Sequence, residues 1–229
     1  MAACRLVIAD DHPLFRDALR LTASQALPDA EIVEAGSFES LKDALEATPE
    51  ADLVLLDLNM PGMLGLSGLL FVRAAFSAVA VAIISANEEP RVIRQALELG
   101  AMGYIPKSTA PAEIRTALAA LLAGEMWLPT GSDLNRRGSS DDAELVSRLA
   151  SLTPQQVRVL MMLSEGLLNK QIAHALYVSE ATIKAHVSAI LEKLGVDNRT
   201  QAVIIAQRLV VDAAQSDALG RAAGLEASR

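Results

Sequence analysis

Three aspartates stand directly after apolar runs of the sequence. Asp10 and Asp11 follow the run RLVIA, and Asp57 follows the run LVLL. If both runs are neighbouring parallel strands, the three carboxylates converge at one edge of a sheet, and such a cluster is costly unless a cation neutralises it. Hard oxygen ligands with open positions suit Mg²⁺, which keeps water ligands and accepts a phosphate oxygen. The backbone carbonyl of Asn59 could add an oxygen, so the sequence predicts a Mg²⁺ site.

Two hydrogen-bond donors follow the later apolar runs. Ser85 comes directly after VAVAII, and Lys107 comes two residues after MGYI. A hydroxyl and an ammonium are the donors that a phosphoryl group on Asp57 would need. Taken singly, an aspartate at a strand end is more often a turn or cap residue, and a lysine is more often a solvated charge. Because the whole set falls in order on one sheet edge, the pattern indicates phosphoryl chemistry.

Alternating segments position these residues. The strand-like runs lie at 5–10, 31–35, 52–57, 79–84 and 102–105, and the helix-like stretches at 13–27, 38–47, 66–76, 88–99 and 111–123. The third and fourth runs are continuously apolar, as expected of strands that helices cover on both faces. The pattern predicts a doubly wound α/β domain with a five-stranded parallel sheet, in which ligands bind at the carboxyl ends of the strands.

The same half of the chain resembles bacterial receiver domains over about residues 4–125. The matching segments are IADDHPLFRDALR, LVLLDLNMPG, IISA and GAMGYIPKS. The resemblance implies a flavodoxin-like fold, a sensor histidine kinase as phosphoryl donor, and no enzyme activity in the ordinary sense. It also implies the role of each site residue: Asp57 as the phosphoacceptor, Asp10, Asp11, Asp57 and the Asn59 carbonyl as holders of Mg²⁺, Ser85 and Lys107 as contacts of the phosphoryl group, and Tyr104 as an aromatic switch that follows Ser85 inward.

The second half of the chain has a purely helical pattern. The segment PTGSDLNRRGSSDD, from Pro129 to about Asp142, is rich in Gly, Ser and charge and is typical of an exposed linker. After it, helices are predicted at 154–164, 169–176, 180–194 and 200–208. Thr153 before Pro154 predicts the start of the first helix, and Ser179 predicts the N-cap of the longest one.

The predicted helix 180–194 has one apolar side and one small, polar side. The apolar stripe consists of Ile183, Val187, Ile190, Leu191 and Leu194, and Ala181, Ala185, Ser188 and Glu192 point away from it with Lys184 on the flank. A helix that lies in a major groove needs such a face, because base edges must be approached closely. From the pattern alone, a helix-turn-helix and a small helical bundle with a merely soluble outer face are nearly equally favoured.

The segments LTPQQVRVL, NKQIAHAL, SEATIKAHVSAILEKLGV and NRTQAV resemble, in order and spacing, the LuxR-type domain of the NarL/FixJ regulators. The resemblance implies an all-α, four-helix helix-turn-helix domain that binds promoter DNA as a homodimer. The residues implied to contact DNA are Lys184, Ala185 and Ser188 with Thr182 on the long helix, and Asn169 and Lys170 near phosphates. Ser188 stands where many relatives carry a basic residue, so base readout is expected to depend on Lys184 and small-residue contacts.

Charge and composition limit the other possibilities. The net charge is −8; residues 1–128 carry −8 and residues 150–212 carry +1, so a single copy should attract DNA phosphates only modestly. A lone cysteine, Cys4, agrees with a reducing cytosol, and no stretch approaches the roughly 20 apolar residues of a membrane span. A cytoplasmic protein without a membrane partner is expected. His12, beside the acidic pair, is expected to pack or hydrogen-bond because hard Mg²⁺ sites favour oxygen ligands.

The sequence therefore predicts a two-component response regulator in which phosphorylation of Asp57 switches dimerisation and DNA binding. Its expected parts are a receiver domain (1–128), a linker (129–149), a LuxR-type domain (150–212) and a tail without assigned function (213–229). An aspartate-nucleophile phosphatase is an alternative, but it does not explain residues 152–208. A phosphorylation-dependent interaction module that has lost DNA binding is another. It also stays open whether the unphosphorylated receiver covers the helix 180–194 or only supplies a dimer interface.

Overall fold

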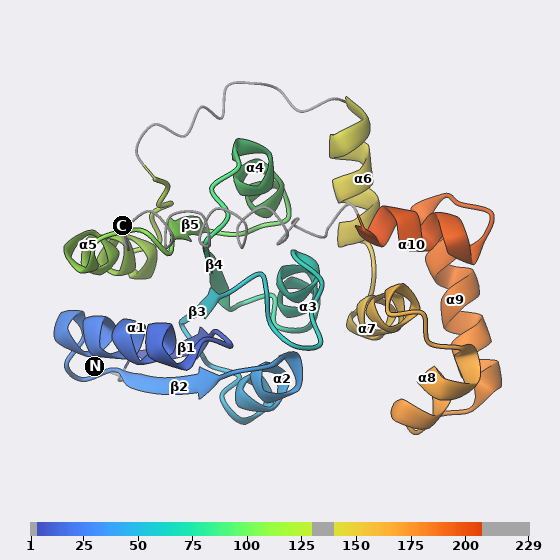
Figure 1. Ribbon diagram of the computed structural model, residues 1–229, viewed down its shortest axis with the longest axis horizontal. Coiled ribbons are helices and arrows are strands. Elements are labelled where there is room, and N and C mark those ends of the chain that lie inside the picture. Colours follow the sequence, from blue (N-terminus) through green and yellow to red (C-terminus); the bar gives the residue numbers. More distant parts are fainter. Residues whose placement is uncertain (1–3, 130–139, 208–229) are drawn as a thin grey trace, which may run out of the picture.

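The computed structural model describes residues 4–129 and 140–207, which form two domains (Figure 1). The N-terminal domain contains a five-stranded parallel sheet with the order β2-β1-β3-β4-β5. Its strands are β1 (Arg5–Ala9), β2 (Glu31–Ala35), β3 (Leu53–Leu56), β4 (Ala80–Ser85) and β5 (Gly103–Pro106). The chain runs from β1 to one edge and then crosses back to β3, which confirms the predicted doubly wound topology.

Helices cover both faces of this sheet (Figure 1). One face carries α1 (Pro13–Ala26) and α5 (Pro111–Leu122), and the other carries α2 (Phe38–Ala47), α3 (Ser67–Ala75) and α4 (Pro90–Glu98). Alternate residues of each strand point to opposite faces. Leu6 and Leu55 pack into the cluster under α1 and α5, whereas Val7 and Leu56 pack into the cluster under the other three helices. Burial on both faces explains why these strands are continuous apolar runs.

The strand register brings the carboxyl ends of β1, β3, β4 and β5 together. Ala9 pairs with Leu56, and the backbone N–H of Asp57 donates to the carbonyl of Ala9 at 2.8 Å. On the other side of β3, the backbone N–H of Lys107 donates to the carbonyl of Ser85 at 2.8 Å. Asp10 and Lys107, which are far apart in the sequence, therefore lie at the same edge of the sheet.

The described part of the C-terminal domain is entirely helical, as predicted. Its helices are α6 (Ser140–Ala150), α7 (Pro154–Ser164), α8 (Asn169–Ala175), α9 (Glu180–Leu194) and α10 (Arg199–Gln207). Thr153 caps α7 with a capping box, and the Ser179 side chain accepts a hydrogen bond from the Thr182 N–H at the start of α9. Gly195, with φ 66°, ends α9 in the left-handed conformation. No helix within the described ranges is both long and apolar enough to cross a membrane.

Helix α6 differs from the sequence expectation, which places residues 129–149 in a linker. The helix begins at Ser140, and Leu149 is only 1% exposed because α6 packs against α9, α3 and α4. Arg148 donates to the Leu194 carbonyl at 2.9 Å and so joins α6 to the end of α9. The Gly- and Ser-rich segment ends at about Asp142, so α6 overlaps it only at residues 140–142, and tertiary packing stabilises the rest of the helix within the expected linker. Residues 130–139 and the predicted tail 213–229 lie outside the described residues.

Candidate functional site

The three predicted aspartates come together at the sheet edge with Lys107. Asp10 and Asp57 are buried, with 0% and 1% of their surface exposed, and Asp11 is partly exposed. The Lys107 Nζ lies 2.9 Å from Asp57 Oδ2 and 2.7 Å from Asp10 Oδ2. It donates a hydrogen bond to Asp57, whereas its contact with Asp10 is ionic without hydrogen-bond geometry. Phe15 covers the ammonium with its ring at 4.9 Å, a contact that nothing in the local sequence indicates.

Burial dominates the electrostatics of Asp57. It raises the pKa of Asp57 above the ordinary value of 3.8. The charge and hydrogen bond of Lys107 and the backbone N–H of Asn59 oppose this rise, while the negative charge of Asp10 adds to it. Because a nucleophilic carboxyl group must be ionised, cations beside Asp57 are needed to favour the reactive form.

The arrangement fits a hard divalent cation. One ligand atom from each of Asp10, Asp11, His12 and Asp57 lies within 4.8 Å of the others. Asp10 Oδ2 and Asp11 Oδ1 are buried and accept no hydrogen bond from the described residues. Their neighbours are the Lys107 ammonium at 2.7 Å and the His12 ring at 2.8 Å, so a metal ion would share these two oxygens with those groups. Carboxylate oxygens are the donors that Mg²⁺ prefers. Participation of the Asn59 carbonyl stays a prediction, although its N–H is bonded to Asp57.

His12 stands at the solvent side of this cluster. Its side chain is 65% exposed, and Nδ1 lies 2.8 Å from Asp11 Oδ1 and 4.0 Å from Asp57 Oδ2. The backbone N–H of His12 donates to Asp10 Oδ1 at 2.8 Å. His12 therefore holds the two aspartates in place by polar contacts, in line with the sequence expectation.

Ser85 and Tyr104 are joined through Asn87, which the sequence analysis does not single out. Ser85 is fully buried, and its hydroxyl accepts a hydrogen bond from the Asn87 N–H at 3.2 Å. Tyr104 is also fully buried and donates its hydroxyl proton to the Asn87 carbonyl at 2.5 Å. Burial raises the pKa of Tyr104, so the phenol stays a donor. In this conformation the Tyr104 side chain already lies inside the domain. The outward position from which the predicted inward movement would begin is therefore not seen. In the sequence, Asn87 stands out only as a polar residue between β4 and α4, two positions after the end of β4.

The candidate DNA face lies on α9 and α8. Thr182, Lys184, Ala185 and Ser188 are exposed on α9, opposite the apolar stripe that includes the fully buried Ile183, Ile190 and Leu194. The predicted two-sided helix is therefore confirmed. Lys184 forms an ion pair with Glu180 at 3.2 Å and is 66% exposed, so this contact is easily given up. On α8, Lys170 is exposed and Asn169 is partly buried.

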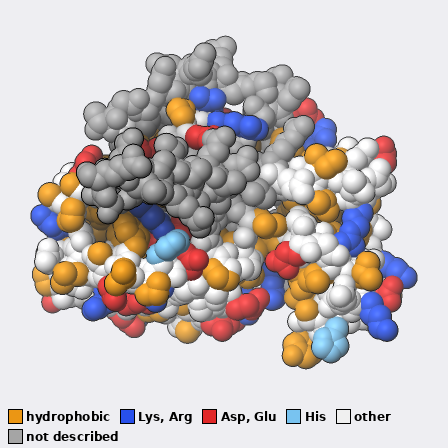
Figure 2. All heavy atoms as spheres, in the orientation of Figure 1, with side chains coloured by type: hydrophobic (Ala, Val, Ile, Leu, Met, Phe, Trp, Pro, Cys, Tyr) orange, Lys and Arg blue, Asp and Glu red, His pale blue; other side chains and the backbone are white. Residues whose placement is uncertain are grey.

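The space-filling view shows how the surface charge is divided between the two domains (Figure 2). On the face shown, acidic side chains gather along the lower edge of the N-terminal domain, whereas basic and acidic side chains are mixed along the outer side of the C-terminal domain. This agrees with the acidic balance of residues 1–128 and the slightly basic balance of residues 150–212. By net charge, the C-terminal domain is therefore the better electrostatic match for a polyanion.

Comparisons with known proteins match both halves of the chain. Residues 6–119 match the response regulator receiver domain, and residues 150–206 match the bacterial regulatory proteins of the luxR family. The glycerol metabolism activator of Pseudomonas putida is 40% identical over 208 residues, which cover 88% of this chain and 94% of that protein. The nitrate/nitrite response regulator protein NarL of Escherichia coli K12 is 32% identical over 201 residues, covering 87% of this chain and 93% of NarL.

Solved structures give the same result for the fold. RcsB from Salmonella enterica serovar Typhimurium, bound to a promoter in the presence of the phosphomimetic BeF₃⁻, is 25% identical with a TM-score of 0.53, covering 90% of this chain and 97% of that one. A structure of two RcsB dimers bound to two parallel DNAs is 26% identical with a TM-score of 0.54, covering 91% of this chain and all of that one. With a receiver domain and a LuxR-type helix-turn-helix domain in the same order as in these regulators, the chain belongs to the NarL/FixJ family of two-component response regulators.

Proposed function

We propose that a sensor histidine kinase phosphorylates Asp57 and that the phosphorylated protein pairs on promoter DNA to regulate transcription. The observation that carries this proposal is the buried Asp57 carboxyl group with the Lys107 ammonium at 2.9 Å and the buried Asp10 beside it. Ser85 stands on the next strand of the same edge. An aspartate with only a structural role at the surface would not need a buried cation and a second buried carboxylate beside it.

The chemistry is the transfer of a phosphoryl group to a carboxylate. An Asp57 oxygen attacks the phosphorus of a phosphohistidine, the O–P bond forms as the N–P bond breaks, and the imidazole leaves with the electron pair. Lys107 is placed to offset negative charge on the phosphoryl oxygens, and the Ser85 hydroxyl is a further donor. When bound by Asp10, Asp11, Asp57 and the Asn59 carbonyl, Mg²⁺ supplies charge neutralisation. The chain is modified and does not turn over a substrate, so we propose no enzyme activity in the ordinary sense.

Promoter DNA is the proposed partner of α9. Lys184 is the exposed cation of this helix, and the small Ala185 and Ser188 leave room for close approach to base edges. Asn169 and Lys170 on α8 are proposed to lie near phosphates. The RcsB structures with DNA, whose fold this chain shares, support the assignment. Because residues 150–212 carry a charge of only +1, binding by two copies is expected to be required for firm attachment.

Intact mass measurement after incubation with acetyl phosphate and Mg²⁺ tests the phosphorylation site. We expect one added phosphate in the wild type and none in Asp57→Asn. Asp43→Asn is the matched control, because Asp43 is an exposed carboxylate on α2 with a side chain 73% exposed. Equal labelling of Asp57→Asn and the wild type would show that the assignment is wrong.

A further inference from the structure

Asp10 and Asp11 are neighbours in the chain, yet both belong to the acidic cluster. One ligand atom of each lies within 4.8 Å of those of the other members of the cluster. Successive residues of a strand point to opposite faces of the sheet, so a regular continuation of β1 would send the two carboxylates apart. The strand ends at Ala9. The conformation of the peptide group between Asp10 and Asp11 therefore decides whether both carboxylates reach the site.

Two hydrogen bonds hold the chain at this peptide group. The His12 N–H donates to Asp10 Oδ1 at 2.8 Å, so the Asp10 side chain closes a turn over the next two residues. The Asp10 carbonyl, which belongs to the peptide group itself, accepts from Arg16 Nη1 at 2.6 Å. Asp10 keeps its own N–H in the sheet, where it donates to the Ala35 carbonyl at 2.9 Å. The orientation of the peptide group between Asp10 and Asp11 thus depends on the Arg16 side chain.

The Arg16 guanidinium is itself held by a residue of β2. Its Nε donates to Glu34 Oε2 at 2.9 Å. Only 21% of the Arg16 side chain is exposed, which limits the competition of water for both contacts. A planar guanidinium presents several N–H donors in a fixed arrangement and can contact two acceptors at once, whereas a lysine has a single nitrogen on a flexible stem. Arg16 therefore connects α1 with β2 and with the end of β1.

We propose that Arg16 is a positioning residue for the Mg²⁺ site. By bonding to the Asp10 carbonyl, it holds Asp10 and Asp11 in the orientation in which both carboxylates can meet the metal ion. Arg16 acts through this peptide group and is not itself a ligand of the metal ion or a partner of the phosphoryl group. The inference rests on the proposed function, since it needs the acidic cluster to bind Mg²⁺.

The charge of Arg16 and its hydrogen bond act on Mg²⁺ binding in opposite directions. A cation near the site repels Mg²⁺, so removal of the charge alone should strengthen Mg²⁺ binding. Removal of the hydrogen bond leaves the peptide group after Asp10 free to turn, so Mg²⁺ must order it on binding, and the affinity should fall. The sign of the change in Mg²⁺ affinity therefore separates a positioning role from a purely electrostatic one.

The Mg²⁺ affinity of the metal-free, full-length protein, measured by isothermal titration calorimetry, tests the proposal. Arg16→Met removes the charge and both hydrogen bonds, and should weaken Mg²⁺ binding about 10-fold, as expected for a group that orients a metal ligand. Arg16→Lys keeps the charge but loses the fixed set of donors, and should weaken binding by less, about 2- to 5-fold. Equal or tighter Mg²⁺ binding by these variants overturns the proposal. If Arg16→Met does not fold, Arg16→Lys alone decides.

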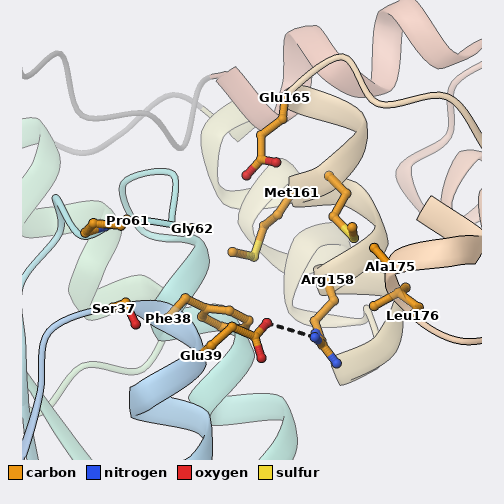
Figure 3. Close-up of a pocket in the computed structure, with 11 residues that line it drawn as sticks. Ser37, Phe38, Glu39, Pro61, Gly62, Arg158, Met161, Glu165, Ala175 and Leu176 are labelled. Carbon is orange, nitrogen blue, oxygen red and sulfur yellow. Dashed lines mark hydrogen bonds and ion pairs between the residues drawn. The ribbon is translucent and has the colours of Figure 1, made fainter. Parts of the chain in front are cut away.

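Two other arginines provide matched controls. Arg20 pairs with the same β2 glutamate at 3.2 Å, so Arg20→Met removes a cation from that carboxylate but leaves the bond to the Asp10 carbonyl in place. Arg158 is also 21% exposed and pairs with Glu39 at 2.9 Å, at the contact between the two domains (Figure 3). Both control variants should bind Mg²⁺ within about twofold of the wild type. A loss in either control as large as that in Arg16→Met would overturn the proposal, because the contact with the Asp10 carbonyl would not be its cause.

Labelling by acetyl phosphate at different Mg²⁺ concentrations shows whether Arg16 acts only through the metal site. Arg16→Met should need about 10-fold more Mg²⁺ for its half-maximal rate and should reach a plateau rate within about 3-fold of the wild type. A plateau rate that falls further than the Mg²⁺ requirement rises would overturn the positioning role, because Arg16 would then act in the transfer itself. If the wild type binds no Mg²⁺, the proposed metal site fails and the inference fails with it. A failure of the inference alone leaves the Mg²⁺ affinity and the labelling of the wild type intact.

Discussion

The Lys107 ammonium lies 2.9 Å from the carboxyl group of Asp57, yet burial still raises the pKa of Asp57 above 3.8. A raised pKa means that the folded state binds more protons than the unfolded state in the pH range just above 3.8. Stability is therefore lost as the pH rises through the pKa of the folded state. The ionised Asp57 is a source of instability at neutral pH that the chain keeps for its chemistry.

The first prediction is that Asp57→Asn raises the melting temperature of the metal-free protein at pH 7, because the variant no longer buries a charge. The gain should shrink as the pH is lowered toward 4. Added Mg²⁺ should also reduce it, since a bound cation stabilises the wild-type carboxylate. Thermal unfolding with and without a chelator measures these differences, with the exposed Asp43→Asn as the control. Equal melting temperatures of Asp57→Asn and the wild type at pH 7 would contradict the argument.

The second prediction concerns Tyr104, whose hydroxyl donates to the Asn87 carbonyl in the core. Tyr104→Phe leaves that carbonyl without its donor and should lower the free energy of unfolding by about 1–3 kcal/mol. Tyr177→Phe is a matched control, because Tyr177 is 94% exposed and the change there should cost less than about 0.5 kcal/mol. Denaturant unfolding measures both variants. A similar loss in both would show that the hydrogen bond inside the receiver is not responsible.

The third prediction concerns Lys184 on the exposed side of α9. Lys184→Ala should weaken binding to the specific DNA site by about 1–3 kcal/mol if the ammonium contacts a base. Lys170→Ala should weaken binding to all sequences alike and reduce the salt dependence by about one counterion. Lys42→Ala on α2 serves as the control. A binding isotherm for Lys184→Ala that superimposes on that of the wild type would remove α9 from the interface.

The fourth prediction is that phosphorylation produces a dimer that binds DNA more tightly than the monomer. A dimer makes twice as many contacts with DNA as a monomer does. This matters because residues 150–212 of each chain carry a net charge of only +1. Light scattering and binding to a two-half-site duplex should both change after treatment with acetyl phosphate and Mg²⁺, and neither should change for Asp57→Asn. If the oligomeric state and the DNA affinity of the wild type both stay the same, the switching hypothesis is wrong.

Most of the fold follows from local patterns, because a strand that is buried on both faces and a helix with one apolar stripe each have a characteristic period. The same patterns place Asp10, Asp57 and Lys107 on one edge, since parallel strands align their carboxyl ends. They do not indicate the contact between Glu39 and Arg158, which are 119 positions apart. Nor do they indicate α6, whose Leu149 is buried by partners that are distant in sequence. The local sequence patterns therefore do not indicate how one domain packs on the other.

The open side of α9 affects how fast the protein can respond to its signal. A protein that exposes its DNA face before phosphorylation can already hop and slide along the chromosome through weak phosphate contacts. We expect the acidic receiver, with −8 over residues 1–128, to shorten these encounters by repelling the DNA. We therefore expect the search for promoters to be under way before the signal arrives. The delay after stimulation would then be set by the meeting of two chains already close to the DNA.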